Sequence, residues 1–83
     1  MNIVDANVIL RYLLNDIKDL AEKAAQLLES EEVYIPNEIT AEVVYVLEKV
    51  YKVEREDIAS AITELLGYSN INIPDRRMLV LNF

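Results

Sequence analysis

The sequence predicts a small α/β fold in which short parallel strands alternate with pairs of helices. Short apolar, mostly β-branched segments occur at positions 3–4 and 33–35, and a weaker one, in which Asn alternates with Ile, occurs at 70–73. Between them, apolar residues recur every three or four positions, which is the spacing of an amphipathic helix. Strands separated by helical segments are typical of a parallel sheet, because parallel neighbours need a crossover connection.

The composition limits the possible chemistry. The 83 residues allow one domain, spanning positions 1–83, and the 53% apolar content excludes a disordered chain. Because the chain contains neither Cys nor His, disulfides, thiolate zinc sites and His-based catalysis are excluded. A bound metal would have oxygen ligands, which suit a hard cation such as Mg²⁺ or Mn²⁺.

The charge and the N-terminus indicate where the protein acts. A net charge of −7 argues against broad phosphate binding, so contact with nucleic acid would be local and mediated by a metal. No basic segment is followed by a long apolar run, so we expect neither a signal peptide nor a membrane span. The absence of Cys fits a reducing environment, so we expect a cytoplasmic protein.

The first half of the chain predicts one strand and two helices. Positions 3–4 form a brief buried strand that ends at Asp5, and a helix follows from Ala6 to Leu14. Asp16 is placed to cap a second helix that extends to about position 30. The apolar side of that helix comprises Leu20, Ala24, Leu27 and Leu28.

The second half repeats this pattern. Pro36 closes the strand at 33–35, and Asn37 is placed to cap a third helix. The apolar stripe of that helix comprises Ile39, Val43, Val46, Leu47 and Val50. A fourth helix covers about 58–66 and stops near Gly67, before a weak strand at 70–73. A further element begins at 76–83, where the apolar ending predicts either continuing chain or a partner that covers it.

Three side chains are candidates for a functional site. Asp5 follows the first strand, where ligands bind at the carboxyl ends of parallel strands, although an Asp there is also a natural helix cap. Glu42 lies at the margin of the third helix's apolar stripe, where it is either solvated or facing a cleft. Asn7, two residues after Asp5, is either an auxiliary ligand or a local cap.

The two carboxylates could share a metal ion. Mg²⁺ typically takes one or two carboxylates together with waters and substrate phosphate oxygens. Such a site activates water for phosphodiester hydrolysis. Spacing in the sequence alone does not show that Asp5 and Glu42 converge.

Three segments carry a family resemblance. Positions 3–10 resemble the opening of PIN domains, with a short apolar strand, an Asp, a small residue, an Asn and an apolar helix. Positions 39–47 resemble the second motif of that family, a Glu between apolar residues on a helix. The segment 53–74 is similar to VapC-type members, so the resemblance covers the whole chain.

The resemblance implies a fold and an activity. It implies a three-layer α/β/α fold with a short central parallel sheet, and a Mg²⁺- or Mn²⁺-dependent endoribonuclease. VapC-type members are toxins that cut RNA and are silenced by an antitoxin protein. On this chain Asp5 and Glu42 correspond to the catalytic metal ligands, and Asn7 to an auxiliary polar position.

The chain also departs from the family pattern. One or two further Asp residues of the pattern do not occur within these 83 residues, and Asp75 does not match them. We therefore expect the fold to be incomplete at its C-terminal side and the chain alone to be a weak or inactive nuclease. The first strand would then have an open edge, which favours a homo-oligomer. The alternatives are a non-catalytic PIN-like binding module and an unrelated helical interaction protein.

Overall fold

The computed structural model describes residues 2–74, which form a three-stranded parallel sheet and four helices. The strands are β1 (Asn2–Ile3), β2 (Val33–Tyr34) and β3 (Ile71–Asn72), in the order β1-β2-β3. Ile3 aligns with Tyr34, and Tyr34 with Asn72. The predicted α/β class and the parallel sheet are therefore confirmed.

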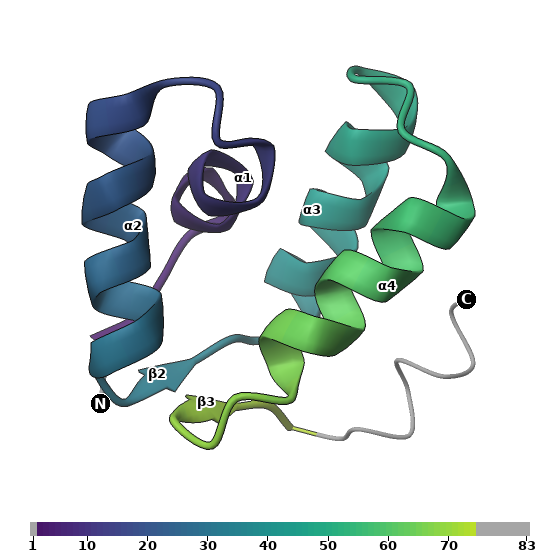
Figure 1. Cartoon of the computed structure of the whole chain (residues 1–83). Coiled ribbons are helices and arrows are strands. Elements are labelled where there is room, and N and C mark those ends of the chain that lie inside the picture. Colours follow the sequence, from purple (N-terminus) through teal and green to yellow (C-terminus); the bar gives the residue numbers. More distant parts are fainter. Residues whose placement is uncertain (1, 75–83) are drawn as a thin grey trace.

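The helices connect the strands in pairs. Helices α1 (Ala6–Leu14) and α2 (Lys18–Ser30) join β1 to β2, and helices α3 (Asn37–Lys49) and α4 (Arg55–Leu66) join β2 to β3. Helix α1 lies between α2 and α3, while α4 packs against α3 and β3 (Figure 1). None of the helices described is long and apolar enough to span a membrane. The element predicted at 76–83, and Asp75, lie outside the described residues.

The core forms where the helices cover the middle strand. Burial of aliphatic side chains provides most of the driving force for this packing. Thr40 on α3 is the one buried polar residue in the described part of the chain. The largest fully buried side chains are Ile9, Leu28, Ile35, Ile58, Ile62, Leu65 and Ile71.

The first strand differs from its prediction. It comprises Asn2–Ile3 rather than positions 3–4, and the Ile3 side chain is 72% exposed. Within residues 2–74, β1 pairs with β2 on one side only, so its other edge has no strand beside it. Val4, just beyond the strand, is the buried residue of this segment.

The start of α2 also differs. The N-cap position is Ile17, which makes no side-chain cap, and the predicted cap residue Asp16 pairs with Arg11 instead. Leu20 was expected in the core but is 43% exposed, whereas Ala21 is buried. The buried side of α2 is therefore displaced by one position at its first turn.

Two further expectations about helix ends are wrong. Pro36 occupies the N-cap position of α3, so Asn37 is its first residue rather than its cap. Val50, predicted in the apolar stripe of α3, is 63% exposed. Gly67 does end α4, as predicted, but with a right-handed backbone (φ −81°) that other residues adopt as well.

A polar cluster fastens α1 to α2 and to the segment after α4. The Tyr12 hydroxyl donates to Glu29 Oε2 at 2.7 Å and lies 2.9 Å from the Tyr68 hydroxyl. Burial, together with these two hydrogen bonds, raises the pKa of Tyr12 far above its usual range. The Tyr12 hydroxyl therefore stays protonated at physiological pH and can donate a hydrogen bond.

Asn70 fixes the C-terminal end of α2 to the sheet. Its Nδ2 donates to the carbonyl oxygens of Leu28 and Glu31, each at 2.7 Å. The last carbonyls of a helix have no partner within the helix, so a side-chain donor that reaches them stabilises its end. Asn70 comes directly before β3, so this contact sets the position of α2 relative to the strands.

Candidate functional site

Asp5 lies at the carboxyl edge of the sheet, between β1 and α1. Its backbone is extended (φ −90°, ψ 174°) and its Oδ1 accepts a hydrogen bond from the Val8 amide at 3.2 Å, which makes it the N-cap of α1. The side chain is nevertheless exposed. One carboxylate oxygen is held by the helix while the group remains accessible, so capping and ligand binding are compatible here.

A groove of about 580 Å³ opens beside Asp5, between α1 and α2. Its polar and charged lining comes from Asp5, Asn7 and Arg11 on the α1 side and from Lys23 on α2. Val8, Leu20, Ala24 and Leu27 provide its apolar lining. The structure therefore places Asp5 and Asn7, two of the three candidate residues, in one groove.

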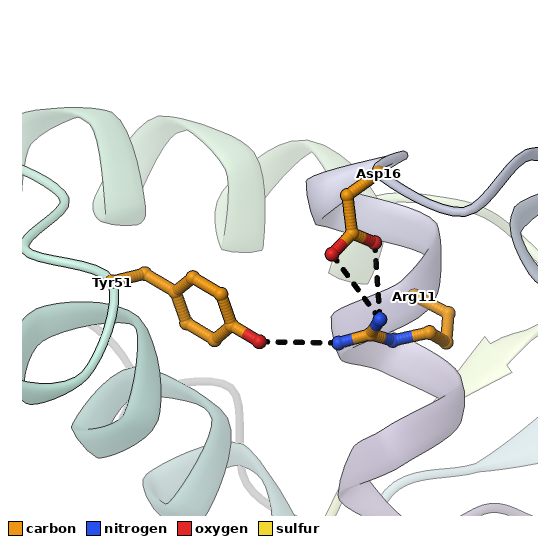
Figure 2. Close-up of polar contacts among 3 residues, drawn as sticks. All are labelled: Arg11, Asp16 and Tyr51. Atoms are coloured by element: carbon orange, nitrogen blue, oxygen red, sulfur yellow. Dashed lines mark hydrogen bonds and ion pairs between the residues drawn. The ribbon is translucent and has the colours of Figure 1, made fainter.

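Arg11 is held in this groove by side chains from two connections. Its Nη1 donates to both carboxylate oxygens of Asp16, at 3.1 and 3.2 Å, and its Nη2 donates to the Tyr51 hydroxyl at 3.3 Å (Figure 2). Asp16 belongs to the α1–α2 connection and Tyr51 to the α3–α4 connection. The Arg11 side chain is 20% exposed, so it is both fixed and reachable from solvent.

Glu42 is a residue of α3 that does not line this groove. It is exposed, and it has no hydrogen bond or ion pair within residues 2–74. Helices α1 and α3 pack against one another, and each begins where a strand ends, on neighbouring strands. Asp5 and Glu42 thus belong to adjacent helices, but their convergence on one metal ion stays a prediction.

The side chains available near Asp5 suit a hard cation. The carboxylate of Asp5 and the amide oxygen of Asn7 are oxygen donors of the kind that Mg²⁺ and Mn²⁺ prefer. Residues 2–74 contain no group of three or more acidic, His or Cys side chains that could hold a metal ion. A metal bound here would keep most of its coordination positions for water and phosphate oxygens.

Tyr51 is the functional-site neighbour that sequence reasoning misses. It follows α3 by two residues and reaches Arg11 across 40 positions of sequence. Lys52, directly after it, adopts a left-handed backbone (φ 58°) that turns the chain toward α4. A non-glycine residue at positive φ is uncommon, but the sequence contains no Gly or Asn here to signal it.

Comparison with known families identifies the family of the chain. The PIN domain family model matches residues 3–79, so the chain belongs to the PIN domain family. The matched range includes Asp5 and the helix that carries Glu42.

The chain is also similar to a curated protein, a "VapC ribonuclease" of Aquifex aeolicus (strain VF5). The two sequences are 32% identical over 78 residues, which cover 88% of this chain and 57% of the relative. The chain thus spans somewhat more than half the length of this curated relative. No solved structure matches the chain significantly.

Proposed function

We propose that this chain forms part of a divalent-metal-dependent endoribonuclease of the VapC type, with Asp5 and Glu42 as metal ligands and Asn7 beside them. The observation that carries the proposal is Asp5, an exposed carboxylate fixed at the carboxyl end of a parallel strand and at the mouth of a groove. The PIN family membership and the name of the Aquifex relative support ribonuclease chemistry.

Each residue would contribute a defined part of the reaction. A bound Mg²⁺ or Mn²⁺ would supply a water of lowered pKa and positive charge at the phosphate. Asp5 would hold the cation with the oxygen that does not accept the Val8 amide, and Glu42 would approach from the adjacent helix α3. Water adds to the phosphorus of the RNA, one P–O ester bond breaks, and the leaving oxygen takes up a proton.

The expected biological role is that of a toxin whose partner is an antitoxin protein, as the resemblance to VapC-type members implies. A chain with two carboxylates should bind the metal less tightly than one with more, because each carboxylate adds charge and a ligand. We therefore expect weak cleavage from these 83 residues alone. If metal and RNA bind but no cleavage occurs, the alternative function, a non-catalytic PIN-like binding module, is favoured.

The test is RNA cleavage at high protein concentration, with Mg²⁺ or Mn²⁺ and with chelator. Asp5→Asn removes the ligand charge, and Asp57→Asn is the matched control on α4, where Asp57 is exposed and outside the groove. We expect slow cleavage that requires metal, is lost in Asp5→Asn and persists in Asp57→Asn. Equal rates for wild type and Asp5→Asn would overturn the proposal.

A further inference from the structure

The groove between α1 and α2 brings two cationic side chains together on an acidic protein. The chain has a net charge of −7, with eight Lys and Arg residues. Two of these eight, Arg11 and Lys23, line the groove, and Asp5 is its one acidic lining residue. Asp16 pairs with Arg11, so the groove is close to neutral, and a strand that enters it meets two cationic groups beside the proposed metal ligand.

Arg11 has the geometry of a phosphate-binding residue. A guanidinium has five N–H donors in a rigid fork. The contacts to Asp16 and Tyr51 use Nη1 and one donor of Nη2, which leaves Nε and the other Nη2 proton without a partner among residues 2–74. Because its side chain is already fixed, Arg11 loses little conformational freedom when it binds a ligand.

Asp5 and Arg11 line the same groove, at the start and in the second turn of α1. A phosphate bound at Arg11 can therefore belong to the same strand as a phosphate near Asp5. The apolar lining from Leu20 and Leu27 lies in the same groove and can contact the flat face of a base.

We propose that the α1–α2 groove receives one nucleotide of single-stranded RNA, with Arg11 bound to a backbone phosphate of that strand. This inference rests on the proposed ribonuclease function. The occupant is a single strand because a groove of about 580 Å³ has the size of a site for one small ligand, not for a duplex. Asp16 and Tyr51 act as positioning residues that hold the guanidinium.

The test measures binding of a short, fluorescently labelled single-stranded RNA to the 83-residue chain by anisotropy, with chelator present so that no cleavage occurs. Arg11→Gln is compared with Arg55→Gln, the same substitution on α4 at a side chain that is 66% exposed and outside the groove. We expect Arg11→Gln to weaken binding about tenfold, the effect of one charge-assisted hydrogen bond. Arg55→Gln should bind like the wild type.

The salt dependence separates a phosphate contact from a purely structural role. Loss of one phosphate contact should reduce the slope of log affinity against log salt by about 0.7 for a single strand. Arg11→Lys keeps the positive charge but removes the planar guanidinium. It should therefore retain the slope of log affinity against log salt and lose part of the affinity for RNA. Tyr51→Phe, which removes only the hydroxyl contact, should cause a smaller loss, and circular dichroism confirms that each variant is folded.

The outcomes distinguish this inference from the function on which it rests. Equal effects of Arg11→Gln and Arg55→Gln, an unchanged salt slope, or no RNA binding by the wild type would overturn the role of Arg11. If binding depends on Arg11 but metal-dependent cleavage is absent, the phosphate contact stands and the ribonuclease proposal fails. If cleavage depends on Asp5 but RNA binding is unchanged in Arg11→Gln, the ribonuclease proposal stands and this inference fails.

Discussion

Asp5 and Glu42 have different surroundings, although each belongs to a helix that begins at the carboxyl edge of the sheet. Asp5 accepts a hydrogen bond from Val8 N and shares a groove with Arg11, whose own position is fixed by two side chains. Glu42 is exposed on α3 and has no hydrogen bond or ion pair within the described part of the chain.

The difference indicates that the two halves of the proposed metal site are organised in different ways. The α1–α2 side is built before any ligand binds, because its helices are fastened by Tyr12 and Asn70. On the α3 side the Glu42 side chain has no such contact within residues 2–74, so it would lose side-chain freedom on binding a metal. The predictions below test whether the contacts on the α1–α2 side stabilise the fold and whether the Glu42 side chain on α3 contributes little to stability.

Asn70→Ala should produce the largest effect on stability. It removes both hydrogen bonds that Asn70 donates to the end of α2 and leaves the carbonyl oxygens of Leu28 and Glu31 without this donor. The free energy of unfolding should fall by about 2 kcal/mol, as measured by urea denaturation. Ser69→Ala, at the exposed neighbouring position, is the control and should change little. A matching loss in both variants would show that α2 is not fastened here.

Asp5→Ala and Glu42→Ala compare the two predicted ligands directly in the absence of metal. Asp5→Ala removes the N-cap of α1 and should destabilise the chain by about 1 kcal/mol. Glu42→Ala should stay within about 0.5 kcal/mol of the wild type, as for other exposed positions. Thermal or urea unfolding with chelator present measures both values. A larger loss for Glu42→Ala would mean that its surroundings are more ordered than its lack of contacts indicates.

Tyr12→Phe tests the cluster that joins α1 to α2. Loss of the hydroxyl should cost about 1 kcal/mol at neutral pH, because Glu29 and Tyr68 each lose a partner. The pKa of Tyr12 is raised in the folded state, so its contribution is complete below the unfolded pKa of about 10 and declines as the pH rises above it. Urea denaturation should therefore show wild type and variant converging at strongly alkaline pH. A constant difference across that range would contradict the role of Tyr12.

Ile3→Lys should change association while leaving the fold almost intact. Ile3 is 72% exposed on β1, whose outer edge has no strand beside it in residues 2–74. Such edges pair with other chains, and a charged residue on them discourages pairing. We expect light scattering to find a homo-oligomer for the wild type at high concentration and a smaller species for Ile3→Lys. A wild-type monomer at every concentration would contradict the predicted self-association.

The sequence predicted the locally determined parts of the molecule. The helix Ala6–Leu14 and its capping Asp5 have the expected positions, because an N-cap and an apolar helical stripe depend on neighbouring residues alone. The parallel arrangement of the strands also followed from the helices between them. A competing side-chain contact accounts for the error at the start of α2. Asp16 does not cap α2 because it pairs with Arg11, which also binds a hydroxyl 40 residues away.

The candidate site was predictable only in part. The periodicity of the sequence placed Leu20 on the apolar side of α2. It does not show how far neighbouring elements cover that side, and Leu20 lines an open groove instead. Asp5 and Asn7 could be assigned to one edge of the sheet because they follow a strand directly. The Tyr12–Tyr68 contact spans 56 positions and leaves no pattern in the sequence.

The most direct test of this account is a titration of the ¹⁵N-labelled chain with Mn²⁺, followed by the paramagnetic broadening of its amide signals. If Asp5 and Glu42 bind the same ion, signals of the first turn of α1 and of α3 around Glu42 should broaden together at the same Mn²⁺ concentration. Asp5→Asn should reduce the broadening in both places, while Asp57→Asn should not. Broadening around Asp5 that leaves α3 unaffected, or broadening of other acidic surfaces alone, would contradict a metal site shared by the two carboxylates.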